Sequence, residues 1–299
     1  MFDITLTLDC NGRELVLDRP RIAGIVNVTP DSFSGDGWSS PDAAIAHGLR
    51  LVEEGADALD VGGESTRPGA DEIPVEEELR RVIPVIERLA CECAVPIWID
   101  TSKPEVMRAA VAAGAGMIND VCALRREGAL DAAAGLKVPV CLMHMLGEPR
   151  TMQEDPQYDD VVSDVRRFLA ERIFACEMSG IDKKRIVVDP GFGFGKTLEH
   201  NLALLRALDQ FAALGVPLMA GLSRKAMIGA LTGQGKHADR AIGSAAAALI
   251  AVQRAVMIVR VHDVAATRDA LAVWQGVTSG ISPTKRTPKP FGSQRFEDD

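Results

Sequence analysis

The sequence has 299 residues, of which 47% are hydrophobic and 25% are charged, as in globular proteins with one large core or two small ones. Its net charge of -9 argues against binding to nucleic acid, which usually requires a basic face, so an anion site has to be local. No apolar run approaches the roughly 20 residues that cross a bilayer. The first residues also lack a secretory signal, so we expect a cytoplasmic protein with no membrane partner.

Cysteine and histidine do not favour a metal site made by the protein alone. The six cysteines include no CxxC pair, and a chain of this size needs no disulfides, so we expect reduced thiols. Cys91 and Cys93 could ligate a metal ion, but no matching Cys or His pair stands elsewhere. The histidines form no HExxH motif and no close pair, which disfavours zinc catalysis.

The first predicted element is a small hairpin before Arg21, with Cys10-Asn-Gly-Arg13 as its turn, that caps the bottom of the domain. Short apolar runs then predict strands at residues 22–28, 58–61, 97–100, 117–121, 139–143, 186–189, 217–221 and 257–261. Helical spacing predicts helices between them, for example at residues 76–89, 159–178, 199–214 and 239–256. Apolar strands that alternate with helices indicate a parallel sheet covered by helices.

Polar residues follow nearly every predicted strand, and they favour a closed (β/α)8 barrel over an open sheet. They are Asn27, residues 62–67, Asp100, Asn119, His144, Asp189, residues 223–225 and residues 260–263. In a barrel these residues converge on one rim, where active sites are built, whereas an open sheet spreads them along an edge. We expect one domain over residues 1–282. The Pro- and charge-rich sequence that begins at Ser282 predicts a mobile tail over residues 283–299.

Two familiar motifs are excluded by single residues. The segment Gly191-Phe-Gly-Phe-Gly-Lys-Thr197 looks like a phosphate loop, but Pro190 stands where a Walker motif requires glycine. The segment around Ser223 lacks the second glycine of a nucleophile elbow. Nucleotide hydrolysis and serine-hydrolase chemistry are therefore disfavoured.

The remaining strand-end residues suit a flat heterocycle with an anionic group. Asp100 and Asp189 can each accept two parallel hydrogen bonds from an amino and ring N–H edge, and Asn119 can donate and accept at a neighbouring edge. Lys225 can bond to ring acceptors. The alternative is that Asp100 and Asp189 cap the following helices or pair with lysine.

The last strand predicts an anion site. Arg260 and His262 lie two residues apart and therefore share a face of the strand. In a barrel this strand lies beside the first, so Asn27 can face the same anion and offer its carbonyl oxygen to Mg²⁺ that bridges diphosphate oxygens. The alternative is a surface pair between Arg260 and Asp263 with His262 as a bystander.

Two loops rich in glycine and hydroxyl groups, residues 27–37 and 62–69, have the composition of mobile lids over a rim site, although either could be a plain connector.

The chain shows a family resemblance through ordered motifs between about residue 22 and residue 264. These are Asn27-Val-Thr-Pro-Asp-Ser-Phe-Ser34, Asp60-Val-Gly-Gly-Glu-Ser-Thr-Arg-Pro-Gly69, Asp100-Thr-Ser-Lys-Pro104, Ile118-Asn-Asp-Val121, Met143-His-Met145, Asp189-Pro-Gly-Phe-Gly-Phe-Gly-Lys196, Ser223-Arg-Lys225 and Arg260-Val-His-Asp263. In these segments the chain resembles dihydropteroate synthase, a folate-synthesis enzyme that joins 4-aminobenzoate to a dihydropterin diphosphate in a TIM barrel.

The resemblance implies a role for each group of residues. For the dihydropterin, it implies that the ring is held by Asp100, Asn119, Asp189 and Lys225 and that its slot is lined by Met143 and Phe194. For the other ligands, it implies that diphosphate and Mg²⁺ are held by Asn27, Arg260 and His262, and that 4-aminobenzoate is placed by Thr66, Arg67 and Ser223. It implies further that the loop of Asp31, Ser32 and Phe33 orders over the reacting centre. It also implies a homodimer that packs through barrel helices, and a pocket in which sulfonamides compete with 4-aminobenzoate.

The sequence departs from the family pattern at Gly35-Asp-Gly-Trp38 and at Leu146-Gly-Glu148. Neither segment contains a predicted pterin or diphosphate contact. Two alternatives stay open: a related pterin-binding barrel that transfers a methyl group from methyltetrahydrofolate to a corrinoid, and a paralogue that binds pterin without turnover. The methyltransferase has no need of a diphosphate site at Asn27, Arg260 and His262.

Overall fold

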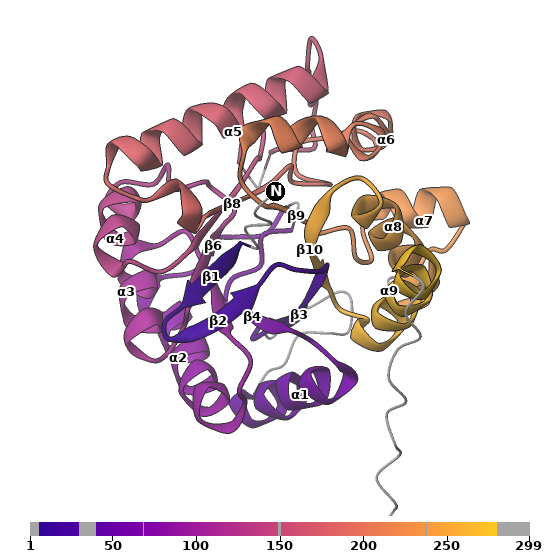
Figure 1. Cartoon of the computed structure of the whole chain (residues 1–299). Coiled ribbons are helices and arrows are strands. Elements are labelled where there is room, and N and C mark those ends of the chain that lie inside the picture. The colour runs from indigo at the N-terminus through magenta and orange to yellow at the C-terminus, as the bar shows by residue number, and fades with distance from the viewer. Residues whose placement is uncertain (1–5, 30–39, 68, 149–150, 237, 280–299) are drawn as a thin grey trace, which may run out of the picture.

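The computed structural model describes residues 6–29, 40–67, 69–148, 151–236 and 238–279. Within these ranges, eight parallel strands close into a barrel in chain order, with the last paired to the first, and helices surround it (Figure 1). A separate antiparallel hairpin precedes the barrel. The predicted (β/α)8 TIM barrel and its N-terminal hairpin are therefore confirmed. The predicted tail over 283–299 and the residues Asp31, Ser32 and Phe33 lie outside the described residues.

The strands fall close to the predicted positions. The hairpin is β1 (Thr7–Cys10) and β2 (Arg13–Val16), and the barrel is β3 (Arg21–Asn27), β4 (Ala58–Gly62), β5 (Ile97–Asp100), β6 (Met117–Asp120), β7 (Val140–Met143), β8 (Ile186–Asp189), β9 (Leu218–Ala220) and β10 (Val256–Val261). The α-helices are α1 (Pro41–Glu54), α2 (Val75–Glu92), α3 (Pro104–Ala112), α4 (Ala129–Leu136), α5 (Val161–Met178), α6 (Leu198–Arg206), α7 (Ala226–Thr232), α8 (Ala241–Val252) and α9 (Val264–Ser279).

Two predicted helices are shorter than expected. The α-helix predicted at 199–214 ends at Arg206, and the chain continues as a 3-10 helix, Leu208–Leu214, which stops at Gly215 in the left-handed region. The helix predicted at 239–256 begins as a 3-10 turn, Ala238–Arg240, and its α-helical part ends at Val252. Ala255, in the short connection to β10, has a positive φ of 70°, which an α-helix does not contain.

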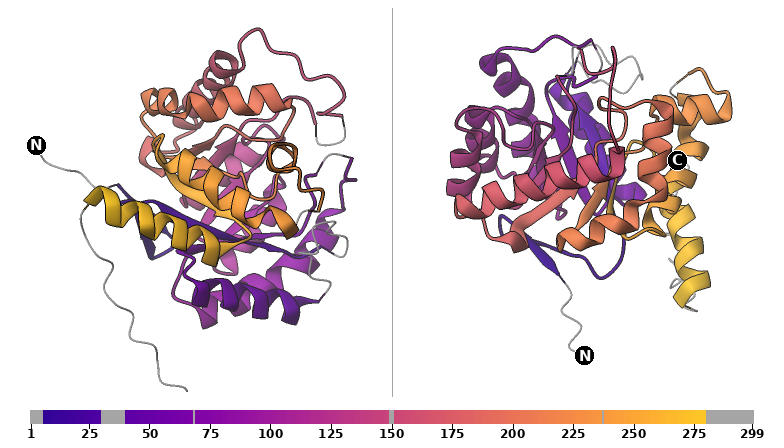
Figure 2. Two further views of the ribbon diagram at one scale, coloured as in Figure 1. Left: turned by 90° about the vertical axis from the view of Figure 1, so that its right-hand side faces the viewer. Right: turned by 90° about the horizontal axis from the view of Figure 1, so that it is seen from above.

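The hairpin closes one end of the barrel. Asn11 and Gly12 both have positive φ, as the tight turn of a two-residue hairpin requires. Leu8, Cys10, Leu15 and Leu17 pack against the lower interior of the barrel, which confirms the predicted cap. Figure 2 shows the hairpin at one end and the loops after β4 and β7 at the other.

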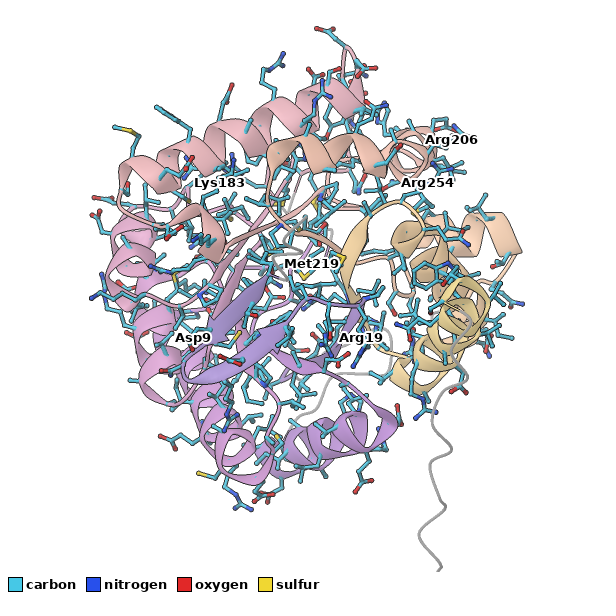
Figure 3. All side chains as sticks on the ribbon, viewed as in Figure 1. Asp9, Arg19, Lys183, Arg206, Met219 and Arg254 are labelled. Carbon is cyan, nitrogen blue, oxygen red and sulfur yellow. The ribbon has the colours of Figure 1, made fainter. Side chains whose placement is uncertain are left out.

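Alternation along the strands separates two apolar regions. One set of side chains packs outward against the helices and forms the main core. The other set points into the barrel and forms its lowest layer: Ala23, Ala58, Trp98, Met117, Cys141, Val187, Met219 and Ile258. Met219 is seen near the centre of the ring in Figure 3. Within the ranges above, no helix combines the length and apolar character needed to cross a membrane.

Candidate active site

The next interior layer of the barrel is polar. On five strands, the residue two positions beyond the apolar floor points to the same inward face and is polar. These residues are Asp60, Asp100, Asn119, Asp189 and Arg260, which follow Ala58, Trp98, Met117, Val187 and Ile258. The strand register brings them level, because Asp100 pairs with Asn119 and Met143 pairs with Asp189. The structure thus brings together the polar strand ends that the sequence predicted to converge.

Arg260 is held by two carboxylates across the barrel. Its Nε donates to Asp60 Oδ2, and its Nη2 donates to Asp100 Oδ2 at 2.7 Å. Asn119 Nδ2 donates to the same oxygen of Asp60 at 3.0 Å. The other oxygen, Asp60 Oδ1, is buried without a hydrogen-bond partner among the described residues. A carboxylate in this state favours an added donor, such as a ligand N–H or water.

The alternative in which Arg260 pairs with Asp263 is wrong. Asp263 instead accepts from Arg224, at 2.6 Å from Nη2 and 3.0 Å from Nε. The interpretation of Asp100 and Asp189 as helix caps is wrong as well. The N-cap of α3 is Lys103, and the N-cap of α6 is Thr197.

Burial shifts the ionisation of the central groups. It raises the pKa of Asp100 to about 7, opposed by the charge of Arg260. It also raises the pKa of Asp189, opposed by the N–H of Gly191, which donates to Asp189 Oδ1 at 2.7 Å. It lowers the pKa of Lys225 to about 8, with the charge of Arg260 as the second cause. Asp100 and Lys225 therefore change charge closer to neutral pH than exposed groups of their kind do.

A sulfur-rich wall stands beside the polar layer. Val121, Met143, Met145 and Met152 form a small buried cluster, with Phe194 packed against it. Lys225 Nζ lies 4.1 Å from the centre of the Phe194 ring. Flexible thioethers and an aromatic face line flat ligands well. Met143 and Phe194 therefore belong to one wall, next to Lys225.

His262 lies against Ser223 at the end of β10. The backbone N–H of His262 donates to Ser223 Oγ at 3.1 Å, and its Nδ1 lies 3.0 Å from the same hydroxyl. Burial, followed by the charges of Arg224 and Arg260, lowers the pKa of His262 well below its ordinary value. The imidazole is therefore neutral at neutral pH and donates through one ring N–H. Strand β3, which ends at Asn27, pairs directly with β10, as predicted.

Thr66 and Arg67 lie in the loop after β4. Both are partly buried. Burial is the main cause that lowers the pKa of Lys225 and of His262, and the charge of Arg67 contributes to both shifts. Arg67 therefore lies close enough to Lys225 and His262 for its charge to act on both.

Two buried residues of the site were missed from the sequence. Asp60 joins Arg260 to Asn119, although no role was assigned to it. Lys196 is almost fully buried, and its Nζ lies 2.8 Å from His144 Nδ1, 2.9 Å from Gly191 O and 3.0 Å from Phe194 O. It therefore fixes the loop that carries Phe194. A polar residue at an inward position of an apolar strand was the available signal for Asp60.

Comparison with known proteins decides between the pterin-binding families. The family model described as "Pterin binding enzyme" matches residues 23–262. The dihydropteroate synthase of Escherichia coli strain K12 is 50% identical over 275 residues, which cover 92% of this chain and 97% of that protein. The chain belongs to the dihydropteroate synthase family.

Solved structures of the family agree with the barrel. Xanthomonas albilineans dihydropteroate synthase with 4-aminobenzoic acid is 64% identical with a TM-score of 0.87, and the match covers 91% of this chain and 98% of that one. The same enzyme with 7,8-dihydropteroate gives 60% identity and a TM-score of 0.83 over 91% and 98% of the two chains. The Yersinia pestis enzyme with a sulfonamide drug complex gives 46% identity and a TM-score of 0.89 over 91% and 99%. These relatives favour the synthase over the corrinoid methyltransferase.

Proposed function

We propose that the chain condenses 6-hydroxymethyl-7,8-dihydropterin diphosphate with 4-aminobenzoate and yields 7,8-dihydropteroate and diphosphate. The observation that carries this proposal is the polar interior layer, in which Asp100, Asn119 and Asp189 stand above the apolar floor of the barrel, with Lys225 close enough for its charge to act on Asp189. A pterin has an amino and ring N–H edge that a carboxylate can accept in parallel, and a carbonyl edge that an ammonium can bond.

The pterin pocket combines hydrogen bonds with a flat wall. Asp189 and Asp100 accept from N–H groups, Asn119 donates and accepts, and Lys225 donates to the ring acceptors. Met143 and Phe194 lie along the faces of the ring, supported by their place in the sulfur-rich wall. Burial of these groups excludes water, which strengthens each polar contact and makes an unpaired group costly.

The diphosphate is assigned to Asn27, Arg260 and His262. Arg260 uses Nε and Nη2 for Asp60 and Asp100, and its Nη1 makes no hydrogen bond with the described residues, so one donor stays available. Among those residues, no group of three His, Cys, Asp or Glu could hold a metal ion by itself. One carbonyl oxygen from Asn27 fits Mg²⁺ only together with diphosphate oxygens and water, a donor set that Mg²⁺ commonly takes. The bound ion would neutralise charge on the leaving group.

The reaction needs no protein nucleophile. Arg260 and His262 stabilise the negative charge that develops on the departing diphosphate, while the electron-rich pterin ring spreads positive charge from the exocyclic carbon. The amine of 4-aminobenzoate then attacks this carbon, held close by the pocket, and the proton that the nitrogen loses passes to the released diphosphate or to water. We therefore propose a dissociative, SN1-like displacement.

The second substrate is assigned to Thr66, Arg67 and Ser223, with Asp31, Ser32 and Phe33 in the closing loop. The charge of Arg67 suits the carboxylate of 4-aminobenzoate. Support comes from the relatives that were solved with 4-aminobenzoic acid and with a sulfonamide drug complex. Sulfonamides should therefore compete with 4-aminobenzoate here.

We also propose a cytoplasmic homodimer whose subunit is a single domain over residues 1–282. The surface that supports the dimer lies on α8 and α9, where Ile242, Val273 and Val277 are 85%, 70% and 80% exposed. These two helices pack side by side. Large exposed apolar side chains on neighbouring helices are typical of an interface.

The test is a diphosphate-release assay with the dihydropterin diphosphate and Mg²⁺, with and without 4-aminobenzoate. We expect release that requires 4-aminobenzoate and that falls at least about a hundredfold in Arg260→Ala, because a donor to the leaving group is lost. Tight pterin binding without release would instead indicate a paralogue that binds pterin without turnover.

A further inference from the structure

Lys103 forms a buried ion-pair network beside the active site. It lies three residues after Asp100, at the N-cap of α3, and its side chain is 6% exposed. Its Nζ bonds to Glu64 and, at 2.7 Å, to Glu78. The side chains of Glu64 and Glu78 are 19% and 1% exposed. Taking these charges out of water costs desolvation energy, and removal of one partner would leave a charge uncompensated.

Glu64 connects this network to the loop after β4. Its Oε2 receives the Lys103 ammonium and also the backbone N–H of Ile73, at 3.1 Å. One oxygen atom therefore joins the beginning of the loop, its end and the start of α3, three residues beyond Asp100. Between these two anchors lie Thr66 and Arg67, the residues assigned to 4-aminobenzoate.

Glu78 connects the same ammonium to a different part of the fold. It lies in the first turn of α2 and belongs to no active-site loop. Burial alone would lower the pKa of Lys103, but the hydrogen bonds and charges of Glu64 and Glu78 more than offset it, so its pKa is raised. Lys103 therefore stays cationic at neutral pH and attracts both carboxylates.

We propose that Lys103 and Glu64 are positioning residues that hold the loop of Thr66 and Arg67 over the 4-aminobenzoate side of the site. This inference rests on the proposed function. It separates two roles on one ammonium: the contact with Glu64 sets the affinity for the arylamine, and the contact with Glu78 stabilises the fold. We expect pterin binding to depend on neither contact, because none of the pterin residues lies in the loop after β4.

The test compares Glu64→Ala with Glu78→Ala in the full-length protein. Glu64→Ala removes the anchor of the loop but leaves one buried pair, so the protein stays folded. We expect its KM for 4-aminobenzoate to rise about tenfold or more, since loosened positioning weakens productive binding. Its KM for the dihydropterin diphosphate should stay within about twofold, and its melting temperature should change less than that of Glu78→Ala.

Glu78→Ala should show the opposite pattern, with a lower melting temperature and a KM for 4-aminobenzoate within about twofold of wild type. If Glu78→Ala does not fold, Glu78→Gln takes its place as the control. The inference is overturned if Glu64→Ala leaves the KM for 4-aminobenzoate unchanged, or raises both KM values equally. Failure of the proposed function would give a different result, because the wild-type protein itself would then show no diphosphate release that depends on 4-aminobenzoate.

Discussion

Asp60 supports two of the side chains assigned to substrate. It is fully buried, and it accepts from both Arg260 and Asn119. We expect Asp60→Asn to lower the free energy of unfolding by about 3 kcal/mol, because a buried ion pair loses one partner. Pterin affinity should fall with it, because Asn119 and Arg260 lose their orientation. Urea unfolding and calorimetry measure the two effects, with the exposed Asp209→Asn as the control. If the Asp60→Asn variant were as stable as the wild type and bound pterin as tightly, Asp60 would have no such role.

Pterin binding should depend on pH. Asp100 accepts from the pterin only when it is deprotonated, and burial raises its pKa to about 7. Lys225 donates best when protonated, and burial lowers its pKa to about 8. We therefore expect the affinity for 6-hydroxymethyl-7,8-dihydropterin to rise from pH 6 toward an optimum between these values, then to fall. Calorimetry across pH checks this, and Lys225→Arg should remove the alkaline fall. A flat profile in the wild type would contradict it.

The same shift has a consequence for stability. Because the folded-state pKa of Asp100 lies above its ordinary value, the folded protein holds a proton that the unfolded chain has already released. The contribution of Asp100 to stability is therefore greatest at acidic pH and is lost as the pH rises toward about 7. In the pterin site, binding and stability thus favour opposite charge states of one carboxyl group.

Most site residues could be placed from the sequence because they stand at strand ends. Asp100 and Asp189 each close a short apolar run, Asn119 lies near the end of another, and the barrel geometry brings the three level. Asp60 was missed because it lies inside a run, where the pattern was interpreted as a continuous strand. Its contacts come from strands far away in the sequence, and no local pattern specifies them.

At the scale of elements, the loop after β8 depends on glycine. Gly191 has a φ of 70°, and a Cβ there would lie 1.9 Å from the carbonyl oxygen of His144. We expect Gly191→Ala to cost more than about 2 kcal/mol and to weaken pterin binding, because the loop that carries Phe194 has to move. Gly135→Ala is the matched control: it lies in α4 with open space around it and should stabilise by about 0.5–1 kcal/mol. Thermal unfolding compares them, and equal stability of the two variants would contradict the expectation.

The elements themselves were predicted well where a single rule governs them. The strands of a parallel barrel are buried on both faces, so they appear as apolar runs. The hairpin turn at Asn11 and Gly12 follows from residues that tolerate positive φ. The break after Arg206 was not predicted, because Ala207 and the residues that follow have ordinary helical composition. Tertiary packing rather than propensity decides such a boundary.

At the scale of the whole molecule, the prediction of a closed barrel came from the placement of functional residues more than from hydrophobic periodicity. Alternating strands and helices fit both an open sheet and a barrel, and only the convergence of polar strand ends favoured the barrel. The pairing of β10 with β3 confirms that closure.

The proposed dimer can be tested on the α8 and α9 surface. We expect Ile242→Glu combined with Val273→Glu to convert a dimer into a monomer, because the two charges would be buried at the interface without partners. Light scattering after size exclusion measures the mass. Met178→Glu, at an equally exposed apolar residue on α5, is the matched control and should leave the mass unchanged. A wild-type monomer, or a double variant that stays dimeric, would contradict the proposed interface.

The most direct test of the polar interior layer as a condensing site is to identify the product by mass spectrometry. The wild-type protein is incubated with the dihydropterin diphosphate, 4-aminobenzoate and Mg²⁺, and the diphosphate released is measured in the same sample. We predict 7,8-dihydropteroate in a one-to-one ratio with diphosphate, and none from Asp189→Asn. Diphosphate released without 7,8-dihydropteroate, or neither product from a protein that binds the pterin, would contradict the assignment.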